Sequence, residues 1–205
     1  VALNYHHYIL SPYAHEMVKT KSDQPCRNIL LNYLHQIPSK QLNKMRVLDF
    51  GCGPGNLIPH IDKKIAQLVG VDKSAGSLKI ASSIAEKHEV IFESICDDII
   101  NVHDEAGFDL IISSNSILPN SREEVVTIFS RLNSLLSTNG KLLGILPSFD
   151  TTLYLQELRK KENKQGNNEN VLVDEEMLAY ADDGYHLQCY HTPQSILEET
   201  ALAGL

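Results

Sequence analysis

The sequence lacks the features that would assign it to several specialised classes of protein. It contains no tryptophan and only four cysteines, at positions 26, 52, 96 and 189. No two cysteines form a C-x-x-C pair, and none stands with a histidine at zinc-finger spacing, so we expect reduced thiols in a cytoplasmic protein and no metal site. No apolar run approaches the roughly 18–20 residues that a membrane helix needs, and the first residues lack the pattern of a signal peptide.

Positive charge is also scarce. Eighteen Lys and Arg residues stand against 26 Asp and Glu residues, which gives a net charge of −8 and a pI of about 5.5. Proteins that bind nucleic acid neutralise many phosphates with surplus Lys and Arg, so nucleic acid is not the expected partner. The 42% of hydrophobic residues is ordinary for a globular protein, and 205 residues are enough for one domain with a substantial core.

Short apolar runs alternate with helical patterns through the middle of the chain. Apolar spacing predicts helices at 77–88 and at 121–136, the second opening with the capping box Ser121 and Glu124 and ending at Asn139–Gly140. This alternation predicts an α/β fold, a Rossmann-like doubly wound and mostly parallel sheet flanked by helices. The predicted strands, of which the second, fourth and fifth are apolar on both faces, lie at 46–50, 67–72, 90–95, 108–114 and 140–146.

A glycine-rich turn follows the first predicted strand. Residues 51–55 have the spacing GxGxG, and glycine there permits positive φ and close approach of a ligand to the main chain. The sixth position is Asn56, whereas a dinucleotide fingerprint has Gly or Ala there. Asp49 stands just before the turn, where a carboxylate would repel a pyrophosphate but suits an ammonium group. Asp72 closes the second strand, where an acidic residue binds ribose hydroxyls; the alternative for Asp72 is a helix N-cap.

These features together resemble the class I S-adenosylmethionine-dependent methyltransferases. The resemblance covers residues 40–148 closely and residues 190–205 more loosely. It implies that the protein binds S-adenosyl-L-methionine as cofactor and passes the methyl group to an acceptor. The segments that carry the resemblance, in the family's order and spacing, are VLDFGCGPG at 47–55, VGVDKS at 69–74 with Ala81 in the following helix, FDLIISS at 108–114 and NGKL at 139–142.

The resemblance also implies roles for individual residues. The glycines of the turn would hold the methionine part of the cofactor, Asp49 would face its amino group, directly or through water, and Asp72 would bind the ribose. Asp97 would accept a hydrogen bond from the adenine amino group and Asp98 would supply a backbone N–H, with a one-residue ambiguity across 96–98. The implied cofactor-binding residues, of which the last two would line the methyl-donor pocket, are Asp49, Gly51, Cys52, Gly53, Asp72, Lys73, Asp97, Asp98, Ser114 and Asn115.

By the same resemblance, residues 1–205 are expected to be a single methyltransferase domain. The family's sheet continues after the last helix with a strand hairpin, which we expect to be missing from this chain. An open edge beside the fifth strand is a pairing liability, and a homodimer could cover it. The expected parts are an N-terminal helical cap at 1–45, a cofactor-binding core at 46–148, a variable lid or insert at 149–192, polar and exposed over 160–170, and a last helix at 193–205.

The expected acceptor is a small molecule. Residues 114–119 lack the Asn/Asp-Pro-Pro-aromatic tetrad of family members that methylate base amines or protein glutamine. Tyr and His gather near both ends of the chain, and Tyr13, Tyr190 and His191 are the candidate substrate contacts, although packing is the more ordinary role for each ring. No catalytic residue is assigned. The alternatives are a non-catalytic cofactor-binding or interaction subunit of the same fold, a protein methyltransferase, and a dehydrogenase-type dinucleotide binder, against which Asn56 argues.

Overall fold

A computed structural model gives the structure of the chain, and it describes residues 25–61, 65–149, 171–173, 179–181 and 189–205. The chain forms two compact units, which are described separately. The first unit comprises Val1–Ser113 and Leu135–Leu143, and the second comprises Ser114–Ser134 and Gly144–Leu205. No helix among the described residues is long and apolar enough to cross a membrane.

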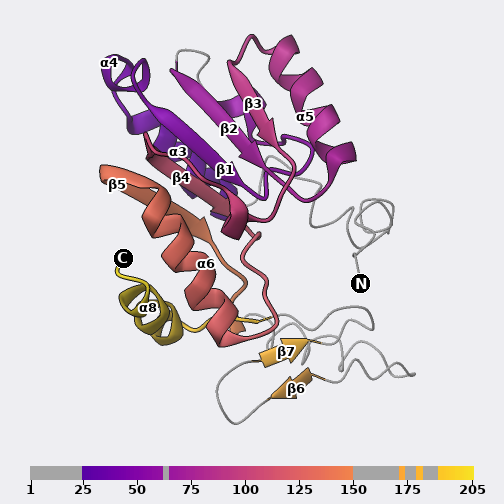
Figure 1. Cartoon of the computed structure of the whole chain (residues 1–205), viewed down its shortest axis with the longest axis vertical. Coiled ribbons are helices and arrows are strands. Elements are labelled where there is room, and N and C mark those ends of the chain that lie inside the picture. Colours follow the sequence, from indigo (N-terminus) through magenta and orange to yellow (C-terminus); the bar gives the residue numbers. More distant parts are fainter. Residues whose placement is uncertain (1–24, 62–64, 150–170, 174–178, 182–188) are drawn as a thin grey trace. The chain divides into compact units, whose positions relative to one another are not determined.

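The central feature is a five-stranded sheet in the order β3-β2-β1-β4-β5 (Figure 1). β1 pairs in parallel with β2 on one side and with β4 on the other, and β2 pairs in parallel with β3. The predicted α/β class with a parallel sheet flanked by helices is therefore confirmed. The strands are β1 (Arg46–Phe50), β2 (Gln67–Val71), β3 (Phe92–Ile95), β4 (Phe108–Ser114) and β5 (Leu136–Ile145).

The register of the sheet brings the ends of neighbouring strands together. Phe50, the last residue of β1, lies opposite Val71 at the end of β2 and opposite Ser113 in β4. The middle strands are apolar on both faces because both faces are covered, and Leu48, Leu68 and the Ile111–Ile112 pair are fully buried. The loops after β1, β2 and β3 therefore leave the sheet along one carboxyl edge, where open α/β sheets bind ligands.

The helix α5 (Ala75–Lys87) begins two residues before the predicted range of 77–88. Its N-cap is Ser74, whose hydroxyl accepts a hydrogen bond from the backbone N–H of Ser77. The alternative interpretation of Asp72 as a helix N-cap is therefore wrong. The other described helical elements of this unit are α3 (Pro25–Gln36), α4 (Ser39–Leu42), η1 (Ile58–His60) and η2 (Ile99–Asn101).

The helix α6 (Arg122–Leu135) has the predicted start but a different end. The Ser121 hydroxyl accepts from the Glu124 N–H, while the Glu124 carboxylate accepts from the N–H of Asn120 instead of completing the capping box. The expected end at Asn139–Gly140 is wrong, because β5 begins directly after the helix and includes both residues. A Cβ at Gly140 would lie 2.6 Å from the carbonyl oxygen of Phe108, so this glycine allows close approach of main chains and is not a helix cap.

The second unit also holds an antiparallel pair and a last helix. β6 (Val171–Val173) pairs with β7 (Ala179–Ala181), and both precede α8 (Pro193–Leu202). The predicted last helix is thus present, and it opens with a reciprocal capping box between Thr192 and Ser195. Among the described residues no strand follows α8. Tyr13 and the polar stretch 160–170 lie outside the described residues.

Candidate functional site

The loop after β1 holds three glycines with positive φ, at +68° for Gly51, +52° for Gly53 and +79° for Gly55. The N–H groups of Gly51 and Cys52 both donate to the carbonyl oxygen of Val71, at 2.8 and 3.2 Å. These bonds tie the start of the loop to the end of β2. Positive φ is strained for residues with a side chain, so the main-chain path requires glycine at these places.

Two of the glycines serve different purposes. A Cβ added at Gly55 would lie 2.6 Å from Cδ1 of Ile58 and 2.9 Å from Cα of Ala81, so Gly55 permits close packing against α5. A Cβ added at Gly53 would meet no atom of the described residues within 4 Å. The main chain at Gly53 is therefore accessible, and a ligand could contact this part of the backbone directly.

The Asp72 carboxylate connects this loop to the next one. Its Oδ2 accepts from the N–H of Gly53 at 2.9 Å, and its Oδ1 accepts from the N–H of Ser74 at 2.8 Å. One side chain at the end of β2 thus holds the middle of the glycine loop and the entry to α5.

Asp49, in β1 beneath the loop, is a buried acid with a 4% exposed fraction. Burial in the protein and, to a smaller extent, the negative charge of Asp72 together raise its pKa to about 7. A buried carboxylate beside a second carboxylate is stabilised in its charged form by a cation, which is the chemistry of an ammonium ligand. Burial and the same two carboxylates raise the pKa of the neighbouring Cys52 thiol, so this thiol stays neutral and unreactive.

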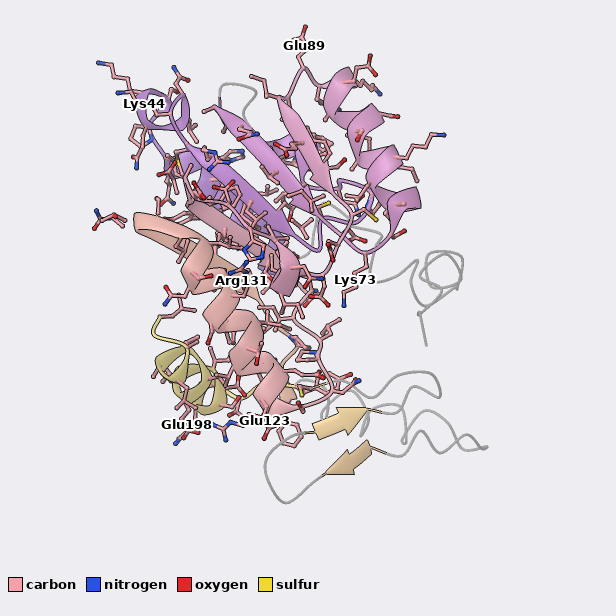
Figure 2. The ribbon with its side chains drawn as sticks, in the orientation of Figure 1. Lys44, Lys73, Glu89, Glu123, Arg131 and Glu198 are labelled. Atoms are coloured by element: carbon pink, nitrogen blue, oxygen red, sulfur yellow. The ribbon has the colours of Figure 1, made fainter. Side chains whose placement is uncertain are left out.

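The loop after β3 carries two acidic residues with different bonds. Oδ1 of Asp97 accepts from the Asn101 side-chain amide at 2.8 Å and from the N–H of Asp98 at 2.6 Å, and these two bonds lower the pKa of Asp97. Asp98 caps η2 and forms an ion pair with Lys73. Figure 2 shows Lys73 at the carboxyl edge of the sheet, whereas Lys44 and Glu89 lie at the opposite edge. The ion pair joins the loops after β2 and β3.

The structure brings eight of the ten predicted cofactor-binding residues to this edge of the sheet. Ser114 and Asn115 belong to the second compact unit, where Asn115 has φ +53° and its N–H donates to the carbonyl oxygen of Ile145. Sequence reasoning missed Asn101, although its place one helical turn after Asp97 was a usable signal. The eight residues lie in or beside the loops after β1, β2 and β3: Asp49, Gly51, Cys52, Gly53, Asp72, Lys73, Asp97 and Asp98.

Comparison with known proteins agrees with this geometry. Residues 47–140 match a family model described as a methyltransferase domain. This part of the chain, which holds the glycine loop and the loops after β2 and β3, is therefore similar to a methyltransferase domain. A ubiquinone biosynthesis O-methyltransferase of Bradyrhizobium diazoefficiens is 28% identical over 105 residues, which are 50% of this chain and 40% of that protein. The chain thus matches less than half of the length of this curated relative.

Solved structures show the same fold as this chain. A S-adenosylmethionine-dependent methyltransferase from Clostridium acetobutylicum aligns with a TM-score of 0.64 and 18% identity, over 93% of this chain and 85% of that one. The magnesium protoporphyrin IX methyltransferase from Synechocystis, solved with bound SAH, aligns with a TM-score of 0.61 and 18% identity, over 86% of this chain and 70% of that one. At such identities the likeness establishes the fold alone.

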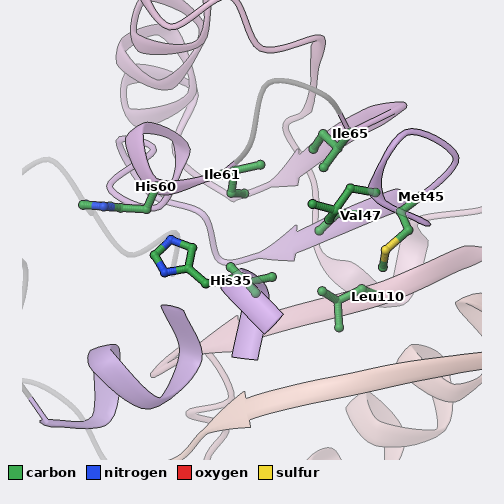
Figure 3. A pocket seen from close by; sticks show the side chains of 9 residues that line it. His35, Met45, Val47, His60, Ile61, Ile65 and Leu110 are labelled. Carbon is green, nitrogen blue, oxygen red and sulfur yellow. The ribbon is translucent and has the colours of Figure 1, made fainter. Parts of the chain in front are cut away.

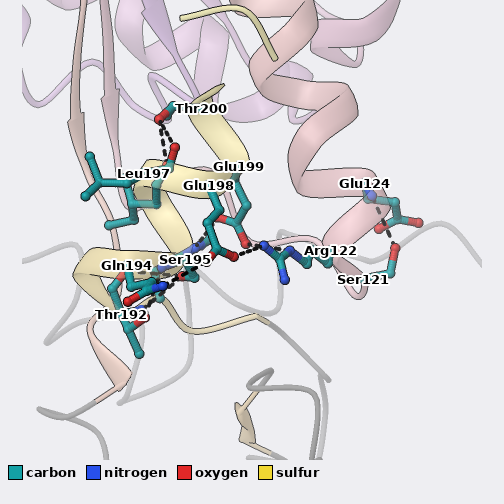
Figure 4. A network of polar contacts seen from close by, with 12 residues as sticks. Ser121, Arg122, Glu124, Thr192, Gln194, Ser195, Leu197, Glu198, Glu199 and Thr200 are labelled. Carbon is teal, nitrogen blue, oxygen red and sulfur yellow. Dashed lines mark hydrogen bonds and ion pairs between the residues drawn. The ribbon is translucent and has the colours of Figure 1, made fainter. Parts of the chain in front are cut away.

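Within the second unit, the chain has a buried acid and imidazole that the sequence did not pair. Nδ1 of His191 lies 3.1 Å from Oε2 of Glu199, with 1% and 0% of the two side chains exposed. Arg122 forms an ion pair with Glu198 and lies 3.9 Å from Glu199 (Figure 4). His191, a candidate substrate contact, is in this structure a buried partner of Glu199, and Tyr190 beside it is half-buried.

A separate apolar pocket lies in the first unit, between α3, β1 and β4 (Figure 3). Among the described residues, the lining of this pocket includes none of the predicted site residues and no acidic side chain, in contrast to the carboxyl edge of the sheet. In the described part of the chain, no three His, Cys, Asp or Glu side chains gather as metal ligands. The pocket is lined by seven apolar side chains and two histidines: Leu34, His35, Leu42, Met45, Val47, His60, Ile61, Ile65 and Leu110.

Proposed function

We propose that the protein is a methyltransferase that uses S-adenosyl-L-methionine and methylates a small-molecule acceptor. The observation that carries the proposal is the arrangement of a buried Asp49, a glycine loop open at Gly53 and a ribose-type Asp72 at one edge of the sheet. These residues fit the cofactor, because its ammonium, its amino-acid main chain and its ribose diol each find a chemically matched group. The cofactor supplies an electrophilic methyl group on a sulfonium.

This chain's own residues bind and orient the reactants. The glycine loop would approach the methionine part without a Cβ in the way, and Asp49 would take the ammonium in a dry environment. Asp72 would accept from the ribose hydroxyls, and the free lone pairs of Asp97 would accept from an exocyclic amino group. Holding donor and acceptor in line accelerates the transfer by positioning, which is the contribution expected of a protein here.

A small acceptor is supported by composition and by the relatives. The net charge of −8 disfavours nucleic acid, and the tetrad typical of base and glutamine methylation is absent from 114–119. The Bradyrhizobium relative is named for ubiquinone biosynthesis and O-methylation, which favours a hydroxyl group on a small ring as the first acceptor to try. The free cysteines at 52, 96 and 189 agree with the proposed cytoplasmic location.

A homodimer through the sheet edge remains part of the proposal. In the described residues, β5 is the last strand of its sheet, with ten residues and β4 as its neighbour in the sheet order. A long edge strand is a template for pairing with a second chain. Light scattering after size exclusion tests this: a dimer of twice 22.9 kDa supports it, and a monomer at every concentration contradicts it.

The activity is tested by incubating the protein with methyl-labelled S-adenosylmethionine and a panel of phenols, catechols, amines and unrelated proteins. We expect label in a small hydroxylated acceptor. Label in a protein supports the protein-methyltransferase alternative instead. Cofactor binding without transfer to any acceptor supports the non-catalytic alternative.

Two glycine variants serve as a matched pair for this assay. Gly53→Ala places a methyl group in the proposed cofactor space, and Gly144→Ala, in β5, places one where no atom of the described residues lies within 4 Å. The first should reduce cofactor binding and turnover about tenfold or more, since it also forces an alanine into positive φ. The second should leave both near the wild-type value.

A further inference from the structure

We propose that Asp72 is a positioning residue that fixes the main chain of the glycine loop before any ligand binds. This inference deepens the proposed function. Only its statement that Asp72 also binds a ribose rests on the proposed function. A ribose contact alone requires a carboxylate near the ligand. The structure gives this carboxylate a further task, because both of its oxygens already accept hydrogen bonds from the backbone of other residues.

Each bond has the geometry of a good hydrogen bond. Oδ2 receives the N–H of Gly53 at 2.9 Å and Oδ1 receives the N–H of Ser74 at 2.8 Å. Asp72 is itself anchored, because its own N–H donates to the carbonyl oxygen of Ile95 in β3. Bonds to an ionised acceptor are roughly twice as strong as neutral ones, so they can hold a flexible loop.

The middle of the glycine loop depends on this bond. The start of the loop is held by two bonds to Val71, and the N–H of Gly55 donates to the carbonyl oxygen of Cys52. Gly53 has a positive φ, no atom of the described residues lies near its added Cβ, and the following Pro54 has no N–H to donate. Among the described residues, the bond from the Gly53 N–H to Asp72 is the one shown that ties the middle of the loop to the end of β2.

The remaining capacity of the carboxylate suits a diol. A carboxylate offers about four lone-pair sites, and the two backbone donors use one on each oxygen. In the described residues no third donor reaches Asp72, so each oxygen keeps one site. The two N–H groups fix the plane of the carboxylate and leave two sites side by side for two vicinal hydroxyls. The same group thus shapes the loop and presents a preformed receptor for a ribose.

Asp72→Asn is the discriminating variant, because an amide has one acceptor oxygen and one donor nitrogen. In either orientation the NH₂ group faces a backbone N–H, and one of the two bonds is lost. Asp97→Asn is the matched control. Both bonds to Asp97 fall on the same oxygen, Oδ1, so an amide oxygen can keep them.

The measurement is amide hydrogen exchange by NMR on the ligand-free protein. In the wild type we expect the Gly53 amide to exchange at least about tenfold more slowly than in an unstructured peptide. In Asp72→Asn, exchange at Gly53 or Ser74 should accelerate at least about tenfold while the amides of β1 and β4 keep their protection. In Asp97→Asn, exchange at Gly53 and Ser74 should not change.

Two results would overturn the inference. The first is free exchange of the Gly53 amide in the wild type, a result that does not depend on whether any variant folds. The second is unchanged exchange at Gly53 and Ser74 in Asp72→Asn, whatever happens to ligand affinity, since Asp72 would then be a ligand contact only. Failure of the proposed function is a separate result, namely no binding of S-adenosylhomocysteine to the wild type by calorimetry.

Discussion

The raised pKa of Asp49 predicts that ligand binding is coupled to release of a proton. In the ligand-free protein the pKa is about 7, so Asp49 is mostly protonated in mildly acidic solution. A ligand that places an ammonium group against Asp49 binds its ionised form, and the proton must leave. Affinity for S-adenosylhomocysteine should therefore rise with pH and level off above about pH 7. By linkage it should fall about tenfold at pH 6 and about a hundredfold at pH 5 relative to the plateau.

Calorimetry between pH 5 and 8.5 measures this dependence. Adenosine, which has no ammonium group, should bind with little dependence on pH over this range. Asp49→Asn removes the titrating group, so its affinity for S-adenosylhomocysteine should be weaker than the plateau value and flat with pH. A flat profile in the wild type, or an unchanged slope in Asp49→Asn, would refute the assignment of Asp49 to the ammonium.

The same pKa has a consequence for stability, with the opposite sign. The folded protein binds a proton at Asp49 more tightly than the unfolded chain, whose Asp titrates near the ordinary 3.8. The free energy of unfolding therefore falls as pH rises from about 4 to about 7, by an amount of the order of 4 kcal/mol. Asp49→Asn should accordingly stabilise the ligand-free protein at pH 8, and the gain should shrink towards pH 4. Urea unfolding at both pH values checks this.

Three further predictions concern stability, each measured by urea unfolding. Gly55→Ala should lower the free energy of unfolding by about 2–4 kcal/mol, because the new Cβ would clash with Ala81 of α5 and the φ of residue 55 is positive. A loss below about 1 kcal/mol would show that the packing at this position is loose. Arg46→Met should lower the free energy of unfolding by about 1–3 kcal/mol, because it removes the paired hydrogen bonds to Asp104. The stabilisation from this pair should disappear as the pH falls below 3.8 and through the lowered pKa of Asp104. Equal free energies of unfolding for the variant and the wild type at neutral pH would contradict this prediction. Glu199→Ala should lower the free energy of unfolding by about 3–5 kcal/mol, because it leaves His191 buried without its partner. The double variant with His191→Phe should lose less than the sum of the two single losses, and simple additivity would show that the two side chains are uncoupled.

The parallel sheet was predictable because its signals are local. Apolar runs on both faces, glycine after the first strand and an acid after the second each follow from a few adjacent residues. Parallel pairing then brings the ends of β1 and β2 together, so Asp49 and Asp72 could be assigned to one site before the structure was known.

The bonds within the site were not predictable in this way. That Asp72 accepts from Gly53, 19 positions earlier, depends on the path of the loop and not on any pattern along the chain. The burial of Asp49 and its raised pKa likewise come from packing around it. The pair His191 and Glu199 is invisible to helical spacing because only Glu199 lies in a helix.

One local signal was misleading. Asn139–Gly140 has the residue types of a helix C-cap, and Asn139 does adopt a positive φ of +66°. The helix nevertheless ends at Leu135, since the following residues are drawn into β5. The roles expected for Ser114, Asn115, Tyr13 and Tyr190 stay predictions.

Direct titration with S-adenosylmethionine and with NAD is the sharpest test of the central claim that the loops after β1, β2 and β3 form a cofactor site for S-adenosylmethionine. We expect one S-adenosylmethionine to bind per chain, NAD to bind much more weakly, and Asp72→Ala to lose about 1.5–3 kcal/mol of binding free energy. Preference for NAD, absence of S-adenosylmethionine binding, or an unchanged affinity in Asp72→Ala would contradict it.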